Sequence, residues 1–180
     1  VPDETYREHK SLVWILNNQK YVKSEDKSSY EYKNDYYGFL PKENKEYEIS
    51  DKLEIPTNTN LIYIADTYGV YTEEYYGDSK QGNKSERIYG GITLDEVNII
   101  KKAVYNGSDL VAEFNTFGSP TDNDTKETLY DLLGLNWTGW KGRYFEKLDK
   151  GIEVPNWAVS SYESKEGEKW NFTGYGFVFV

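Results

Sequence analysis

The segment from residue 87 to residue 143 constrains the fold of this chain more than any other part. A short strand pattern runs into the glycine pair Gly90-Gly91, and a helix pattern follows it. A second strand pattern ends at residues 113–115, and a second helix pattern leads into a run of tryptophans and glycines. Strands and helices that alternate in this order predict parallel pairing with right-handed crossovers. We therefore expect a layered α/β architecture.

The first helix of this segment carries the clearest local signals. Thr93 and Glu96 have the spacing of a capping box, in which each side chain satisfies a backbone donor of the first turn. Apolar residues then follow at helical spacing along one face: Leu94, Val97, Ile100 and Val104. Gly107 favours the left-handed conformation that ends a helix. The pattern predicts a helix that begins after Thr93 and ends before Gly107.

The second helix of the segment is predicted from a similar arrangement. Asp124 and Glu127 repeat the capping-box spacing ahead of several leucines, and Gly134 follows as a stop signal. Residues 109–112, between the two helices, have the apolar character of a buried strand.

Further elements are expected outside this segment. Residues 60–65 form a clear strand pattern, while residues 11–16 are an apolar run that we interpret as a buried strand, with a helix as the alternative. Residues 20–59 are charged and tyrosine-rich, which predicts a loop-rich polar excursion. A short helix is expected at residues 155–162, and residues 170–173 and 177–180 are expected to close the fold as a β-hairpin.

The order of elements from residue 61 to residue 135 resembles the core of the class I glutamine amidotransferase-like superfamily. The resemblance implies a three-layer α/β sandwich with a mostly parallel, flavodoxin-like central sheet. The length of 180 residues separately predicts one compact domain over residues 1–180. It also implies that the loop at Gly90-Gly91 lies at an oxyanion site and that Phe114 lies near the position of the catalytic cysteine. This chain has no cysteine, and its one histidine, His9, is interpreted as a surface side chain near a terminus. Glutaminase activity is therefore excluded.

Composition limits the partners that we expect. The formal net charge of -10 and the pI of about 4.7 disfavour nucleic acid and anionic membranes. No apolar run approaches the roughly 20 residues that a membrane-spanning helix needs. The absence of cysteine suits an extracytoplasmic or cell-surface domain, with the cytoplasm as the alternative. The absence of methionine, even at position 1, predicts a domain excised from a longer protein.

A ligand site is expected where the strands end, because ligands of parallel sheets bind beyond the carboxyl ends of the strands. Residues 66–68, 90–92 and 113–115 should converge there, and we name this place the rim. The candidate ligand-binding residues of the rim are Tyr68, Gly90, Gly91 and Asn115.

Two carboxylates of the rim, Asp66 and Glu113, are candidate catalytic residues. Glycoside hydrolysis needs one protonated and one ionised carboxyl group. The alternative, which we favour, is that Glu113 accepts hydrogen bonds from loop amides and Asp66 caps a turn. An all-oxygen metal site of Asp35, Asp66 and Glu113 would suit calcium or magnesium, but no loop has the spacing of a calcium-binding hand. Neither a metal nor a cofactor is expected.

The aromatic run at residues 136–145 supplies further candidate ligand-binding residues. Trp137, Trp140 and Arg143 alternate with glycines and could hold a sugar ring or an extended polymer. Packing of these tryptophans at a core edge is the alternative that we favour.

These observations give one leading hypothesis and two alternatives. The leading hypothesis is a non-catalytic domain of a larger, surface-associated protein, which binds a ligand such as a carbohydrate at the rim or at the aromatic run. The alternatives are a carboxylate-dependent hydrolase that acts on a glycan, and a structural domain that docks with the rest of its own polypeptide.

Overall fold

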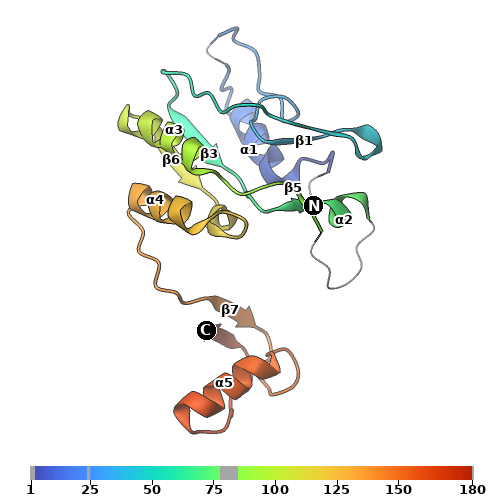
Figure 1. Cartoon of the computed structure of the whole chain (residues 1–180), viewed down its shortest axis with the longest axis vertical. Helices are drawn as coiled ribbons and strands as arrows, with labels where there is room; N and C mark the ends of the chain where they lie inside the picture. Colours follow the sequence, from blue (N-terminus) through green and yellow to red (C-terminus); the bar gives the residue numbers. More distant parts are fainter. Residues whose placement is uncertain (1–2, 24, 78–84, 180) are drawn as a thin grey trace. The chain divides into compact units, whose positions relative to one another are not determined.

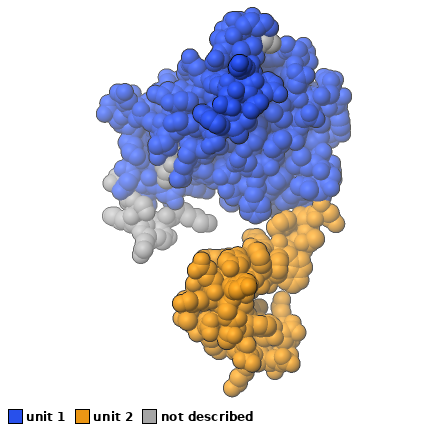
Figure 2. Space-filling model, turned by 180° about the vertical axis from the view of Figure 1, so that it is seen from behind, with its two compact units in different colours: residues 1–135 blue, residues 136–180 orange. Residues whose placement is uncertain are grey.

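The computed structural model describes residues 3–23, 25–77 and 85–179, which form two compact units. Unit 1 is Val1–Leu135 and unit 2 is Asn136–Val180, shown in blue and orange in Figure 2. Each unit has its own cluster of buried apolar side chains. Within the described ranges, no helix is both long enough and apolar enough to cross a membrane.

Three separate two-stranded sheets make up the β-structure described in unit 1 (Figure 1). Two of the pairs are antiparallel: β1 (Phe39–Pro41) with β2 (Tyr47–Ile49), and β4 (Val70–Tyr71) with β5 (Arg87–Tyr89). The third pair is parallel and joins β3 (Leu61–Ile64) to β6 (Asp109–Ala112). Its register sets Leu61 opposite Asp109 and Ile64 opposite Ala112.

The predicted three-layer sandwich with a mostly parallel, flavodoxin-like central sheet is therefore wrong. β3 and β6 are the one parallel strand pair among the described elements, and β5 pairs with β4 instead of joining them. The reason lies in Gly90 and Gly91, whose φ angles of 114° and 77° turn the chain out of the extended conformation directly after β5. A strand of three residues that ends in such a turn pairs with its nearest neighbour, and no wide sheet grows from it.

Two helices cover the parallel pair and form the main core with it. α3 (Leu94–Tyr105) lies beside α4 (Asn123–Leu133), and both follow strands of this region in the chain (Figure 1). The buried residues of this core are Ile64, Ile92, Val97, Ile100 and Leu129. The core therefore combines residues of β3, α3 and α4 with Ile92 of the turn after β5.

The helix ends follow the sequence signals in part. The predicted capping box of α3 is confirmed, because Glu96 N–H donates to Thr93 Oγ1 over 3.3 Å and Thr93 N–H donates to Glu96 Oε2 over 2.7 Å. The cap predicted at Asp124 is wrong by two residues. Asp122 caps α4 instead, accepting hydrogen bonds of 2.9 Å from both the N–H and the hydroxyl of Thr125.

The apolar run at residues 11–16 lies in a helix, α1 (Arg7–Asn18), so the predicted strand is wrong and the alternative is right. Val13 is buried, and Leu12 and Leu16 are partly buried, whereas Trp14 and Ile15 are 65% and 50% exposed. This distribution has the period of a helix. The unbroken run of apolar residues hides that period in the sequence.

A second cluster of unit 1 packs β1 against β4 and β5. Phe39, Val70 and Tyr75 are buried in it. Tyr75 comes from α2 (Thr72–Tyr76), and its ring meets the ring of Phe39 edge-on at 5.3 Å. Its hydroxyl donates to the Glu46 carbonyl oxygen over 2.9 Å. Residues 20–59 thus contribute the β1–β2 hairpin and the short η1 turn (Glu43–Lys45) to this unit.

Unit 2 combines one antiparallel pair of strands with the helix that lies between them in the sequence. β7 (Gly142–Phe145) and β8 (Gly176–Phe179) pair antiparallel, and α5 (Asn156–Glu166) supplies much of the core. The buried residues are Phe145, Val154, Ala158 and Val159. The predicted pairing of residues 170–173 with 177–180 is wrong, although Val180 lies outside the described residues. Trp170 packs instead against the core and donates its indole N–H to the Leu148 carbonyl oxygen over 2.7 Å.

The capping box makes a testable contribution to stability. Thr93→Ala removes the acceptor for the Glu96 N–H and should lower the free energy of unfolding by about 1 kcal/mol. Thr93→Ser keeps a hydroxyl at the cap and should lie close to wild type. Urea unfolding followed by circular dichroism measures both, and equal losses for the two variants would show that the cap hydroxyl does not stabilise α3.

Candidate functional site

Three loops that follow strands meet at the rim of unit 1. The Gly91 N–H donates to the Thr67 carbonyl oxygen over 2.7 Å, which ties the end of β5 to the end of β3. The Asp66 N–H donates to Glu113 Oε2 over 3.1 Å, which ties the end of β3 to the end of β6. The structure therefore brings residues 66–68, 90–92 and 113–115 together. They follow strands of two separate two-stranded sheets, β3–β6 and β4–β5, and not of one wide sheet.

Gly90 and Gly91 allow the backbone segments of the rim to approach each other closely. A Cβ atom at Gly90 would lie 2.4 Å from the Tyr68 carbonyl oxygen and 2.6 Å from Gly69 Cα, so only glycine permits this approach. The Gly91 N–H is already used by Thr67. Gly91 therefore has no backbone donor left for the oxyanion role that the family resemblance implies.

A cavity of about 440 Å³ opens beside the rim. Asp66, Thr67, Tyr68 and Gly91 line it, together with residues of α1, β3, α3 and the chain before β1. Asn115 is not among its lining residues; it lies in η2 (Phe114–Phe117) and is exposed. The cavity has the size of a small-molecule site.

Glu113 holds the rim together and does not line the cavity. The Tyr63 hydroxyl donates to Glu113 Oε1, and the Asp66 N–H donates to Oε2. The hydrogen bond to this carboxylate, followed by burial, raises the pKa of Tyr63 to about 12. Both oxygens of Glu113 are therefore engaged, which agrees with our interpretation that Glu113 accepts a hydrogen bond from a loop amide.

Asp66 differs from Glu113 in its surroundings. Its side chain is partly buried and lines the cavity, and no described residue donates a hydrogen bond to its carboxylate. The turn-capping role that we favoured for Asp66 is thus wrong for the described part of the chain. Asp66 and Glu113 are neighbours, but only Asp66 faces the cavity. The two carboxylates do not flank one cleft as a glycosidase requires.

Phe114 does not lie at a strained elbow, although the family resemblance implies that position. Its side chain is 76% exposed in the η2 turn. Phe114 is also not among the described residues that line the cavity.

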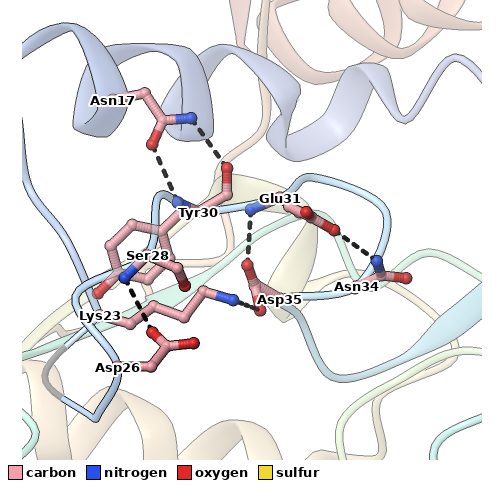
Figure 3. A network of polar contacts seen from close by, with 8 residues as sticks. All are labelled: Asn17, Lys23, Asp26, Ser28, Tyr30, Glu31, Asn34 and Asp35. Atoms are coloured by element: carbon pink, nitrogen blue, oxygen red, sulfur yellow. Dashed lines mark hydrogen bonds and ion pairs between the residues drawn. The ribbon is translucent and has the colours of Figure 1, made fainter.

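The chain between α1 and β1 forms one wall of the cavity and is fixed by the polar network in Figure 3. Asn17 makes two hydrogen bonds to the backbone of Tyr30. Its Nδ2 donates to the Tyr30 carbonyl oxygen over 2.9 Å, and its Oδ1 accepts from the Tyr30 N–H over 3.0 Å. Asp35 accepts from Lys23 Nζ over 2.9 Å and from the Glu31 N–H over 2.6 Å. Because Asp35 is engaged in this way, it does not join Asp66 and Glu113 as a metal ligand, and no such ligand group occurs among the described residues.

His9 lines the cavity, although the sequence indicated a surface side chain. Its Nε2 lies 2.7 Å from the Tyr32 carbonyl oxygen, and its ring lies against the ring of Tyr36 with a centroid distance of 4.3 Å. A carbonyl oxygen only accepts, so Nε2 carries the proton. The helical spacing of His9, Leu12 and Leu16 could have revealed this position, had residues 11–16 been assigned to a helix.

Two pairs of tyrosine and glutamate that the sequence did not reveal also border the cavity. The Tyr68 hydroxyl donates to Glu8 Oε1 over 2.7 Å, and the Tyr37 hydroxyl donates to Glu96 Oε1 over 2.7 Å. Burial is the main cause that raises the pKa of both phenols, and the bonds to the carboxylates add to it. The partners are about 60 residues apart in the sequence, so no local pattern points to them.

A second candidate site lies in unit 2, on the face of β7–β8 that does not carry Phe145. The side chains of this aromatic surface are Tyr144 (48% exposed), Tyr175 (77%), Phe177 (65%) and Phe179 (62%). The ring of Tyr144 contacts Phe177 at 5.4 Å, and Phe177 stacks beside Phe179 at 6.2 Å. A Cβ atom at Gly142 would lie 2.6 Å from the Phe179 ring, so glycine lets this ring lie across the strand.

The predicted residues of the aromatic run fall into two groups. Trp137 and Trp140 precede β7 and are 47% and 60% exposed, so the favoured core packing is wrong for them. Arg143 alternates to the opposite face from Tyr144, and its guanidinium lies 4.9 Å from the centroid of the Phe145 ring. Arg143 therefore does not belong to the aromatic surface.

Comparisons with protein-family models, curated proteins and solved structures found no match to this chain. The resemblance to the amidotransferase-like superfamily accordingly stays a prediction. The function must be inferred from the geometry of the two candidate sites.

The close approach at Gly90 can be tested against a matched glycine. Gly90→Ala and Gly107→Ala both place a side chain at positive φ, 114° and 105°, but no atom of the described residues lies within 4 Å of the added atom at Gly107. Gly90→Ala should therefore cost about 1–3 kcal/mol more free energy of unfolding than Gly107→Ala. Chemical denaturation measures the difference, and equal costs would contradict the close approach of the two loops.

The bond between Tyr63 and Glu113 predicts a pH effect. Because the pKa of Tyr63 is raised to about 12, its contribution to stability is complete below pH 10 and is lost as the pH rises through 12. Glu113→Gln removes the charge that opposes ionisation and should lower this pKa. NMR titration of the Tyr63 ring carbon measures it, with Tyr89 as the internal reference, because burial raises the pKa of Tyr89 to about 12 without Glu113. An unchanged Tyr63 pKa in Glu113→Gln would contradict the bond.

Proposed function

We propose that this chain is a binding protein and that the aromatic surface of unit 2, with Trp137 and Trp140, binds a neutral carbohydrate. The observation that supports this proposal most is the exposure of the rings. Each side chain of the set is 47% exposed or more, and several contact one another in the aromatic surface. Neighbouring exposed aromatic side chains of this extent are characteristic of interaction sites.

The chemistry of the rings favours a sugar as the ligand. The C–H faces of a pyranose ring are apolar and flat, so they pack on phenyl, phenol and indole faces as other apolar groups do. Phenol hydroxyls and indole N–H groups at the ring edges provide hydrogen bonds for sugar hydroxyls. The net charge of -10 opposes the binding of polyanionic glycans. A neutral polysaccharide or oligosaccharide therefore fits better than an acidic one.

The rim supports binding over hydrolysis. Glu113 has both carboxylate oxygens engaged and does not line the cavity, so it does not act with Asp66 across a cleft. The remaining alternative is a docking domain, in which the aromatic surface packs against another part of a longer polypeptide. Sugar binding and docking make different predictions for the isolated chain, because only the first requires affinity for a glycan.

Neutral polysaccharides are common outside cells, so a ligand of this kind favours an extracytoplasmic location for the protein. We propose that the chain works at the cell surface or outside the cell, as part of a larger protein, with the cytoplasm as the alternative.

Affinity electrophoresis of the full chain in gels that contain soluble β-glucan, xylan or glucomannan tests the proposal. At least one polysaccharide should retard the wild-type protein. Trp140→Ala should weaken that binding about tenfold or more, because loss of one large aromatic side chain that contacts a ligand can remove much of the affinity.

Trp14→Ala is the matched control, since Trp14 is 65% exposed on α1 of unit 1 and should leave binding unchanged. Two results would contradict the proposal: no retardation by any neutral polysaccharide, or equal losses in Trp140→Ala and Trp14→Ala.

A further inference from the structure

The cavity of unit 1 has walls of unusual composition. Seven tyrosines line it: Tyr6, Tyr30, Tyr36, Tyr37, Tyr63, Tyr68 and Tyr89. Six acidic residues line it as well: Asp3, Glu8, Asp35, Glu54, Asp66 and Glu96. Among the described lining residues there is no lysine, arginine, asparagine, glutamine or tryptophan. The cavity is therefore rich in aromatic rings and acceptor oxygens and poor in side-chain donors.

The tyrosine hydroxyls supply few of the missing donors, because most of them are already used. Tyr6 donates to the Pro41 carbonyl oxygen over 3.0 Å, and Tyr36 donates to the Phe39 carbonyl oxygen over 2.7 Å. The hydroxyls of Tyr37, Tyr63 and Tyr68 donate to glutamate side chains. What these residues offer a ligand is therefore their rings.

The negative charge of the cavity is neutralised only in part. Arg7 Nε lies 3.4 Å from Glu8, Lys23 Nζ lies 2.9 Å from Asp35, and Lys52 Nζ lies 3.7 Å from Glu54. The Asp66 carboxylate has no hydrogen-bond donor or cation beside it among the described residues. The neighbouring Thr67 hydroxyl is buried without a hydrogen-bond partner in the same part of the chain. A carboxylate and a hydroxyl that lack partners in a cavity wall are the groups expected to meet a ligand.

These walls discriminate among ligand classes. A phosphate or carboxylate ligand would find no lysine or arginine among the described lining residues, and a sugar would find few side-chain donors for its hydroxyl oxygens. A metal ion would need a group of ligating side chains, which is not found among the described residues. An organic cation needs neither donors nor a fixed ligand set, because aromatic faces attract positive charge and one carboxylate suffices as the counter-ion.

We propose that the cavity of unit 1 binds an organic ammonium cation, with Asp66 as its counter-ion and the rings of Tyr68 and Tyr89 among its walls. An alkylated ammonium group fits best, because its methyl groups replace the N–H donors and pack against aromatic carbon. Such a group occurs in free small amines and in methylated lysine side chains. This site is independent of the carbohydrate proposal, which concerns unit 2.

Calorimetry with the full chain tests the proposal, with choline and tetramethylammonium as probes. Both should bind, and 3,3-dimethyl-1-butanol, the neutral analogue of choline with carbon in place of nitrogen, should bind at least about tenfold more weakly. Asp66→Asn should weaken choline binding about tenfold or more. Asp131→Asn, an exposed position on α4 outside the cavity, should leave it unchanged.

The role of the rings is tested separately. Tyr89→Phe keeps an aromatic face and should retain choline binding, whereas Tyr89→Leu should lose it. Thermal unfolding of each variant, followed by circular dichroism, checks that it is folded at the temperature of the titration. A trimethyllysine peptide distinguishes the two possible ligands of the cavity. Binding of the peptide would indicate a methylated lysine side chain, and binding of choline without the peptide would indicate a free small cation.

Three results would overturn the proposal. The first is no binding of either cation to the folded wild-type protein. The second is equal affinity for choline and its neutral analogue, which would show that charge does not matter. The third is an equal effect of Asp66→Asn and Asp131→Asn. A failure here leaves the polysaccharide experiment unaffected, because that experiment probes rings of unit 2.

Discussion

The backbone contact between Thr67 and Gly91 is the interaction on which the rim of unit 1 depends. It requires Gly90, because any Cβ atom there would collide with the Tyr68 carbonyl oxygen. It joins the antiparallel β4–β5 region to the parallel β3–β6 pair, which share no strand. Glu113 adds a second bridge, from β6 to the Asp66 amide. Together these contacts hold Asp66, Thr67 and Tyr68 at the cavity wall.

The same contacts occupy the polar groups of the rim to which the family resemblance assigns chemistry. The Gly91 N–H and both oxygens of Glu113 are used to hold the loops in place. Most tyrosine hydroxyls around the cavity are likewise engaged with internal acceptors. Among the described groups of the rim, the Asp66 carboxylate and the Thr67 hydroxyl remain without partners at the cavity wall, beside aromatic rings.

Local sequence patterns predict where helices and strands lie better than they predict which strands pair. The capping box at Thr93 and the strand at residues 60–65 depend on neighbouring residues, and both are present in the structure. The wide parallel sheet is predicted from element order alone, and order does not reveal that two glycines at positive φ follow β5 or that β5 pairs with β4. The sequence of α1 resembles a strand because its buried and exposed apolar residues are adjacent.

The residues of the candidate sites likewise divide into those that local patterns predict and those that only tertiary packing brings together. Asp66, Tyr68 and Gly91 were found because they follow strands, and they line the cavity. Glu8, His9 and Tyr37 were missed, since α1 and the chain before β1 reach the cavity only through tertiary packing. Phe177 and Phe179 do not follow from the sequence for a related reason: β8 pairs with β7 across more than thirty residues. Only that register places Phe177 opposite Tyr144 and Phe179 opposite Gly142.

The central claim is that the rim faces a cavity that binds cations. The most direct test is to measure nuclear Overhauser effects between the methyl protons of tetramethylammonium and the aromatic protons of the full chain. The account predicts contacts with the rings of Tyr68 and Tyr89 that disappear in Asp66→Asn. Contacts with Phe177 and Phe179 of the aromatic surface in place of those rings, or contacts that persist unchanged in Asp66→Asn, would contradict it.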